Sequence, residues 1–411
     1  MVAGLKFERE PIQVQRAQQM VLEHVQAQPV ERCMLAESFG RRLAVAVTAD
    51  HPVPPFRRSG VDGYAIAAED SAGATPGNAR KLSVMETVLC GMSPVYSIAP
   101  GQASRIMTGA VVPEGADAVV MLEMTAAQGS EVQIFKQVQP EDNITPVGGE
   151  VQRGEELLEA GRVIGAGEAA LLATFGYAEV PVYRKPRVAI FSTGSELLEV
   201  HEPLSPAKIR NSNSYMLASL VREAGGEPLL MPLLPDDPDQ VEQALLDVWQ
   251  QTDLVLTTGG VSVGDKDVLV DLFGRWDGTL LFNKVAMRPG SPTSVGVRHG
   301  KLLFALSGNP GACFVGFELF VRPYIKGMLG AAVREHREAT AYLEADYSRG
   351  SAYPRYVRGT MQLDDGIVKV SPAGRDKSSI TISIKDADCL ICIPAGGRGA
   401  ARGEKVRLLL L

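Results

Sequence analysis

The segment over residues 253–267, Asp-Leu-Val-Leu-Thr-Thr-Gly-Gly-Val-Ser-Val-Gly-Asp-Lys-Asp, decides the fold of this chain. Its apolar run Leu254-Val255-Leu256 has the length of a strand, and the glycine pair Gly259-Gly260 follows it closely. This pattern predicts a buried strand that opens into a loop. Glycine lets a backbone approach a ligand closely, and the amides of a loop that precedes a helix favour an anion. The segment therefore predicts a ligand-binding loop.

Three more polar loops follow apolar runs of strand length. They are Ser192-Thr193-Gly194-Ser195-Glu196, Asp236-Asp237 and Ser307-Gly308-Asn309-Pro310. Four such loops are typical of the ligand-binding edge of a parallel α/β sheet. The alternation of strands and helices from residue 187 to about 330 predicts right-handed βαβ units. We therefore expect a multidomain α/β protein with a central, doubly wound, mostly parallel sheet.

Changes in the spacing of apolar and turn residues indicate the secondary-structure elements along the whole chain. Strands are expected at Val188, Leu229, Leu254, Leu281 and Leu302, and helices over residues 11–25, 31–39, 166–175, 213–223, 238–250, 267–275 and 310–328. Short apolar runs between turn residues predict a β-rich domain over about 82–138 and a second β region from 330 to the end. The chain is long enough for two to four domains.

The composition narrows the class of protein. The 41 Lys and Arg residues against 48 Asp and Glu give a net charge of -7, which argues against a nucleic-acid coat or a membrane-surface binder. Any cations that contact an anionic ligand must therefore be local. The sequence shows no signal peptide and no membrane-spanning run, so a cytoplasmic location is expected. Five scattered cysteines do not suggest a disulfide framework, and Cys389 and Cys392 are expected on opposite faces of a strand.

Two kinds of charged residue could act at the predicted loops. Glu196, Asp236, Asp237, Asp265 and Asp267 fall at one sheet edge, where carboxylates beside an anion site favour Mg²⁺. Alternatively, one of the Asp236-Asp237 pair caps the next helix. The glycine loop is not a P-loop, because Lys266 is displaced by one residue and is not followed by Ser or Thr.

Basic residues occur near turns in three places. Lys284 and Arg288 are four apart in an extended run, so they are expected on the same side of a strand. The pairs Arg57-Arg58 and Arg355 with Arg358 lie in other predicted domains. Such side chains either serve solubility or contact a phosphate or another oxyanion.

Six motifs in order along nearly the whole chain carry a specific resemblance. They are Pro54-Pro55-Phe56-Arg57-Arg58-Ser59-Gly60-Val61-Asp62-Gly63-Tyr64-Ala65, Arg105-Ile106-Met107-Thr108-Gly109-Ala110, Phe191-Ser192-Thr193-Gly194-Ser195-Glu196-Leu197, Thr258-Gly259-Gly260-Val261-Ser262-Val263-Gly264, Arg288-Pro289-Gly290-Ser291-Pro292 and Gly308-Asn309-Pro310. On these motifs the chain closely resembles the molybdopterin molybdenumtransferases, a family that includes the E domain of gephyrin and its plant counterpart.

The resemblance implies a reaction and an architecture. The reaction is insertion of molybdenum from molybdate into adenylylated molybdopterin, assisted by Mg²⁺, with release of AMP and formation of molybdenum cofactor. The architecture is an elongated homodimer of four-domain subunits. The domains would be a molybdopterin-binding α/β domain (1–25 plus 187–327), a small mixed linking domain (26–45 plus 148–186), a β-rich domain (46–147) and a C-terminal β domain (328–411). Possible protein partners are a molybdopterin adenylyltransferase and apo-molybdoenzymes; no nucleic acid and no membrane is expected.

The resemblance also implies roles for individual residues. The metal would be held by Glu196, Asp236 and Asp267. These three residues would also act in catalysis, as would Thr108, Glu150 and Asp62. The basic residues Lys284 and Arg288 would lie near molybdate, and Arg358 and Ser378 would contact the oxyanion. The remaining residues expected to bind the substrate are Ser192, Thr193, Gly194, Asn213, Gly259, Gly260, Ser262, Gly264, Pro292, Gly308, Asn309 and Pro310.

The chain departs from the family pattern at several site positions. The best-known bacterial members have Asp-Asn where this chain has Arg57-Arg58, and Ser291 replaces a lysine. Two alternatives to the main interpretation stay open. One is a relative that handles tungstate or a modified pterin nucleotide, and the other is a non-catalytic binding scaffold like gephyrin.

Overall fold

The computed structural model describes residues 10–234, 237–260, 272–274 and 276–411. The chain forms two compact units. The first comprises residues 1–45, 160–166 and 179–411, and the second comprises residues 46–159 and 167–178. No helix within these described stretches is both long enough and apolar enough to cross a membrane.

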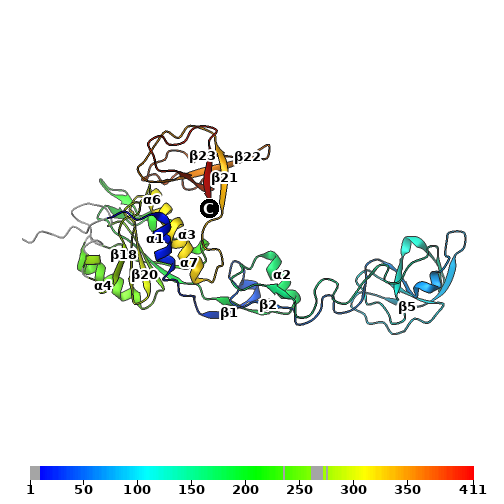
Figure 1. Cartoon of the computed structure of the whole chain (residues 1–411). Helices are drawn as coiled ribbons and strands as arrows, with labels where there is room; N and C mark the ends of the chain where they lie inside the picture. Colours follow the sequence, from blue (N-terminus) through cyan, green and yellow to red (C-terminus); the bar gives the residue numbers. More distant parts are fainter. Residues whose placement is uncertain (1–9, 235–236, 261–271, 275) are drawn as a thin grey trace, which may run out of the picture. The chain divides into compact units, whose positions relative to one another are not determined.

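A six-stranded sheet forms the centre of the first unit (Figure 1). Its strands are β13 (Arg187–Ser192), β16 (Glu227–Leu230), β17 (Leu254–Thr258), β18 (Thr279–Phe282), β19 (Ser294–Arg298) and β20 (Lys301–Leu306). Their order is β16-β13-β17-β20-β19-β18, in which the first four strands are parallel and the last two are antiparallel additions. The predicted α/β class and mostly parallel sheet are confirmed.

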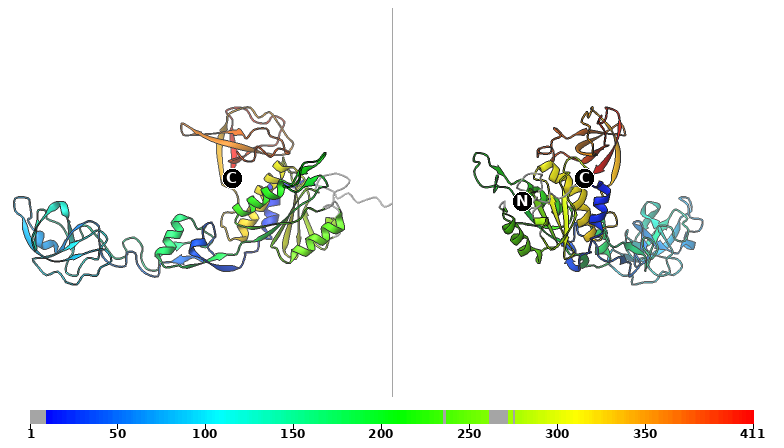
Figure 2. Two further views of the ribbon diagram at one scale, coloured as in Figure 1. Left: turned by 180° about the vertical axis from the view of Figure 1, so that it is seen from behind. Right: turned by 60° about the vertical axis from the view of Figure 1, so that its left-hand side comes forward.

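Helices cover both faces of this sheet (Figure 2). One face carries α1 (Val14–Leu22), α3 (Asn213–Glu223), α6 (Pro310–Gly316), the π-helical turn η4 (Phe317–Val321) and α7 (Arg322–Met328), and the other carries α4 (Pro238–Trp249). The reason is the alternation of side chains along each strand. In β13, Val188 and Ile190 pack under the first group, whereas Ala189 and Phe191 pack against α4. Burial of each large apolar side chain contributes roughly 1.5–3 kcal/mol.

The C-terminal segment of the same unit forms a closed five-stranded barrel, hereafter the barrel. Its strands are β21 (Glu338–Leu343), β22 (Arg355–Asp364), β23 (Ile367–Pro372), β24 (Cys389–Ile393) and β25 (Lys405–Leu410). Cys389 lies in the barrel core, while Cys392 packs against the helices of the α/β domain, so the two thiols face opposite sides as predicted. Tyr356 and Leu409 also join the α/β core, which attaches the barrel to it.

Small elements complete the first unit. They are β1 (Val30–Met34), η1 (Leu35–Glu37), β12 (Glu179–Tyr183), β14 (Leu197–Leu198) and β15 (Ile209–Arg210). The predicted helix over 31–39 is wrong, because residues 30–34 pair with β12 as an antiparallel strand and only a short 3₁₀ turn follows. Tertiary pairing here outweighs local helical preference. The predicted helix over 267–275 lies mostly outside the described residues.

The second unit is rich in β structure, as expected. Its six-stranded sheet consists of β4 (Gly63–Ile66), β5 (Arg80–Val88), β6 (Gln102–Ile106), β7 (Ala118–Met121), β8 (Thr125–Gln128) and β9 (Glu131–Ile134). Shorter elements are β2 (Val47–Thr48), β3 (Arg58–Ser59), η2 (Ala68–Ser71), η3 (Leu122–Met124), β10 (Ile144–Thr145), β11 (Glu156–Leu158) and helix α2 (Ala166–Thr174). Apolar clusters cover both faces of the sheet. The division into four domains stays a prediction.

Candidate functional site

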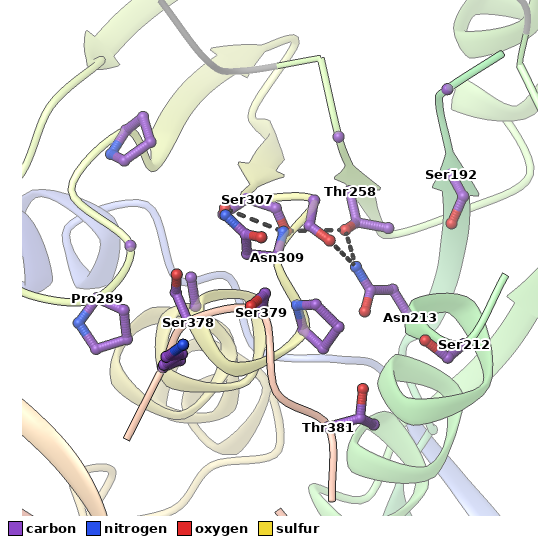
Figure 3. Close-up of a pocket in the computed structure, with 18 of the residues that line it drawn as sticks. Ser192, Ser212, Asn213, Thr258, Pro289, Ser307, Asn309, Ser378, Ser379 and Thr381 are labelled. Carbon is purple, nitrogen blue, oxygen red and sulfur yellow. Dashed lines mark hydrogen bonds between the residues drawn. The ribbon is translucent and has the colours of Figure 1, made fainter. Parts of the chain in front are cut away.

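A cavity of about 1170 Å³ opens where β13, β17 and β20 end (Figure 3). The α/β domain contributes loops from all three strands and from the segment 288–292. The barrel contributes Arg349, Arg355 and the segment 376–381, whose Ser378 carbonyl accepts a hydrogen bond from the Gly311 amide at 2.8 Å. The cavity therefore occupies the predicted ligand-binding edge of the sheet, and the barrel forms its opposite wall.

Buried hydrogen bonds hold the α/β loops in place. The side-chain amide of Asn213 donates to Thr258 Oγ1 at 2.8 Å and to the Gly308 carbonyl at 2.9 Å. Thr258 Oγ1 in turn donates to the Ser307 carbonyl at 3.0 Å. These bonds join α3 to the ends of β17 and β20, as Figure 3 shows. Asn213 Oδ1 is buried and accepts no hydrogen bond from the described residues, so an acceptor remains available beside the cavity.

The glycine pair allows these strand ends to approach one another. Gly259 has φ +94°, and a Cβ atom on it would lie 2.4 Å from the Thr193 carbonyl oxygen. A Cβ on Gly308 would lie 3.3 Å from Gly259. No side chain fits between the backbones here, so the glycines serve loop packing as well as any ligand.

The cavity wall is more basic than the chain as a whole. Its described charged residues are Arg210, Arg288, Arg349, Arg355, Lys377, Glu196 and Asp376. Arg288 and Arg355 come from different domains but lie side by side, because the Arg288 amide donates to the Pro354 carbonyl at 2.9 Å and the Tyr356 amide donates to the Arg288 carbonyl at 2.8 Å. In a chain of net charge -7, this local excess of cations suits an anionic ligand.

The structure brings most of the predicted binding residues of the first unit to this cavity. Those that line it are Ser192, Thr193, Gly194, Glu196, Asn213, Gly259, Gly260, Arg288, Pro292, Gly308, Asn309, Pro310 and Ser378. Asp236, Asp267, Ser262 and Gly264 lie outside the described residues. Asp237 caps α4, accepting from the Asp239 amide at 2.9 Å, as the alternative interpretation of the Asp236-Asp237 pair proposed.

Two predicted basic residues do not line the cavity. Strand β18 ends at Phe282, so Lys284 and Arg288 are not on one side of a strand, and only Arg288 reaches the cavity wall. Arg358 is buried behind the loop that carries Ser378, where Nε donates to Ser383 Oγ at 2.9 Å and Nη2 donates to the Lys377 carbonyl at 3.1 Å. Arg358 therefore supports the loop, and burial lowers the pKa of its guanidinium.

The other three predicted catalytic residues belong to the second unit. The amide and the hydroxyl of Thr108 each donate to Asp62 Oδ1 at 2.7 Å, and these bonds hold the pKa of Asp62 below its usual value. Glu150 pairs with Arg58 Nη2 at 2.6 Å. The neighbouring Arg57 instead donates to the Ala116 carbonyl at 3.0 Å. The Arg-Arg variant thus places one cation on a predicted catalytic carboxylate.

Sequence reasoning missed several residues of the cavity wall. They are Arg210, Asn211, Ser212, Arg349, Asp376, Lys377, Ser379 and Thr381. The polar run before α3 was a usable signal for the first three, because helix starts commonly carry such residues. The barrel residues follow no strand-end rule, so nothing in the sequence pattern pointed to them.

Comparison with known proteins places the chain in a family. Family models match three stretches: the MoeA N-terminal region (domain I and II) over residues 12–176, a probable molybdopterin binding domain over 189–327, and the MoeA C-terminal region (domain IV) over 340–411. The molybdopterin molybdenumtransferase of Bacillus subtilis (strain 168) is 43% identical over 407 residues, which cover 98% of this chain and 95% of that protein. The chain belongs to the molybdopterin molybdenumtransferase family.

Two further relatives agree with this family assignment. A molybdopterin molybdenumtransferase of Staphylococcus aureus (strain Mu50 / ATCC 700699) is 40% identical over 98% of this chain and 96% of that protein. A crystal structure of the molybdopterin biosynthesis MoeA protein from Pyrococcus horikoshii OT3 superposes with a TM-score of 0.84 at 32% identity, covering 98% of this chain and 100% of that one. The cavity of this molybdopterin molybdenumtransferase family member lies within the stretches matched by its molybdopterin-binding and C-terminal domains.

Proposed function

We propose that this chain transfers molybdenum from molybdate to adenylylated molybdopterin, releases AMP and so forms molybdenum cofactor. Membership of the molybdopterin molybdenumtransferase family supports this enzyme assignment over the tungstate and scaffold alternatives. The observation that carries the proposal is the basic cavity at the strand ends of a chain that is acidic overall. Both substrates are anions, so they would gain from cations concentrated at one place.

Different residues of the cavity would bind different parts of the two substrates. Arg288 and Arg355 would meet the oxyanion or phosphate from two sides, with Ser378 donating a hydroxyl hydrogen bond. The unpartnered Asn213 Oδ1 would accept a hydrogen bond from the pterin part of the substrate. The loops themselves are held by the bonds among Asn213, Thr258 and Gly308, so substrate would bind to preformed walls.

We propose that Mg²⁺ binds beside Glu196. Glu196 is exposed at the cavity, and its carboxylate folds over Gly194 so closely that a Cβ there would lie 2.6 Å from Oε2. Oxygen ligands of this kind suit Mg²⁺. We propose that Glu196 holds the ion with Asp236 and Asp267, which lie outside the described residues. Bound there, Mg²⁺ would neutralise charge on the phosphate oxygens during release of AMP.

Several further parts of the proposal rest on the family resemblance. Thr108, Asp62 and Glu150 of the second unit would act in the reaction, and the protein would be a cytoplasmic homodimer. A molybdopterin adenylyltransferase would supply its substrate, and apo-molybdoenzymes would receive its product. Light scattering at micromolar protein concentration tests the dimer, because a mass near the 43.9 kDa of one chain would contradict it.

The decisive experiment combines the purified protein with adenylylated molybdopterin, molybdate and Mg²⁺. We expect release of AMP together with a product that activates an apo-molybdoenzyme. Glu196→Gln should lower the rate about a hundredfold while the protein stays folded, since loss of one charged ligand weakens metal binding. Glu199→Gln, a change three residues away that does not line the cavity, serves as the control. No AMP above background with wild-type protein would overturn the proposed function.

A further inference from the structure

A second, smaller hollow of about 400 Å³ lies on the barrel beside the main cavity. We call this space the barrel hollow. Its charged and aromatic lining residues are Tyr347, Arg349, Arg375, Asp376 and Lys377. Arg349, Asp376 and Lys377 also line the main cavity, so the two spaces share a wall. Arg375 belongs to the barrel hollow alone.

The one acidic group of the barrel hollow is already engaged. The Tyr347 hydroxyl donates to Asp376 Oδ2, and Arg355 Nη1 lies 3.7 Å from the same oxygen. The Asp376 side chain is only 11% exposed, so little of its charge faces an incoming ligand. Asp376 is thus already hydrogen-bonded by Tyr347 of the barrel hollow and paired with Arg355 of the main cavity.

The three cations of the barrel hollow have no such compensation. Arg349 Nη1 donates to the main-chain carbonyl of Asp376 at 2.5 Å, which leaves its charge free. Arg375 and Lys377 are exposed, and a tight turn in which the Lys377 amide donates to the Arg375 carbonyl at 3.1 Å sets their positions on either side of Asp376. In the described part of the chain, none of the three forms an ion pair with a carboxylate.

We propose that the barrel hollow binds a small tetrahedral oxyanion and forms a second anion station next to the main cavity. Guanidinium groups match the oxygens of such an ion, and two of them, Arg349 and Arg375, line the hollow. If the proposed function holds, the ion would be molybdate that moves from the barrel hollow to the main cavity. Arg349 and Lys377 line both spaces, so they could contact the ion in either one. Phosphate has the same shape and charge type, so it should compete.

Calorimetric titration of the full-length protein with molybdate alone, and separately with phosphate alone, tests the station without the pterin substrate. Arg375→Gln should weaken the binding of both ions roughly fivefold, because one exposed charge is removed. The control Arg398→Gln changes an exposed arginine of the same barrel that lines neither space, and should leave both affinities unchanged. Higher ionic strength should shrink the difference between wild type and Arg375→Gln.

Turnover adds a readout that separates this inference from the proposed function. Arg375→Gln should raise the molybdate concentration for half-maximal AMP release roughly fivefold and leave the maximal rate unchanged. Equal affinities for both molybdate and phosphate in wild type and Arg375→Gln would overturn the anion station, even if AMP release is normal. Weakened phosphate binding with unchanged molybdate binding would overturn the delivery of molybdate. Failure of AMP release in the wild type would instead count against the proposed function.

Discussion

The two walls of the main cavity are built in different ways. On the α/β side, buried hydrogen bonds among Asn213, Thr258 and Ser307 fix loops that end parallel strands. On the barrel side, the wall consists mostly of charged side chains, and Lys377 is exposed to solvent. The α/β wall therefore supplies fixed geometry, whereas the barrel wall supplies much of the positive charge. Changes to the first should cost stability, and changes to the second should cost affinity.

A buried ionic cluster joins these two regions and should show the largest effect. Glu318 is 1% exposed and accepts from Arg322 Nη2 at 2.8 Å, while His336 Nε2 lies 2.9 Å from Glu318 Oε2 and Nδ1 lies 2.7 Å from the Leu410 carbonyl of the barrel. Burial would raise the pKa of Glu318, but hydrogen bonds from His336 and Arg322 hold it below its usual value. Glu318→Gln should lower the free energy of unfolding by about 3–5 kcal/mol, because it removes the buried carboxylate that pairs with Arg322 and leaves that guanidinium only its exposed partner Glu223.

The same cluster sets a pH dependence whose direction follows from the lowered pKa of Glu318. Its contribution to stability is present above the pKa of the unfolded chain and disappears as pH falls through the lower, folded value. Urea unfolding of wild type and Glu318→Gln across the acid range measures this. The stability difference between the two proteins should narrow as pH falls, and a constant difference would contradict the assignment.

The next effect isolates the fixed geometry of the α/β wall. Asn213→Leu keeps the side-chain volume but removes both donated hydrogen bonds, so it should cost about 1–3 kcal/mol of stability. Lys377→Gln on the barrel wall should change stability by less than about 0.5 kcal/mol. Urea unfolding of both variants compares the walls directly. Equal losses would show that the barrel wall is as tightly constrained as the α/β wall.

The same contrast explains how much the sequence could predict. Helices α3 and α4, the ends of strands β13, β17 and β20, and the loops after β13 and β20 were predicted correctly, because apolar periodicity and glycine punctuation mark them locally. Arg349 and Asp376 were missed, because they reach the cavity only through barrel closure and docking onto the α/β core. Residues 30–34 were misassigned because their partner strand, β12, lies about 150 positions away in the sequence.

A smaller effect concerns the close approach of strand ends. Gly259→Ala forces a side chain into a left-handed conformation and against the Thr193 carbonyl. Gly403→Ala on the barrel imposes a similar φ of +80° with open space around it, so it measures backbone strain alone. We expect Gly259→Ala to cost about 1–2 kcal/mol more than Gly403→Ala. Thermal unfolding of the pair checks this, and equal losses would show that the loop relaxes away from the contact.

The smallest effect should separate the two arginines that lie side by side across the walls. Arg288 is exposed, so its contribution to anion binding should depend on charge alone, and Arg288→Lys should change molybdate affinity less than about twofold. Arg355 Nη1 lies 3.7 Å from Asp376 Oδ2, and Arg355 Nε is buried without a partner in the described structure. The Arg355 guanidinium is therefore held in one orientation. Lysine cannot reproduce that fork, so Arg355→Lys should weaken molybdate binding about three- to fivefold. Calorimetric titration with molybdate distinguishes Arg288→Lys from Arg355→Lys.

Equal, small losses of affinity would mean that Arg355 of the barrel wall contributes its charge but not a fixed orientation. The two walls would then differ in their contribution to stability alone.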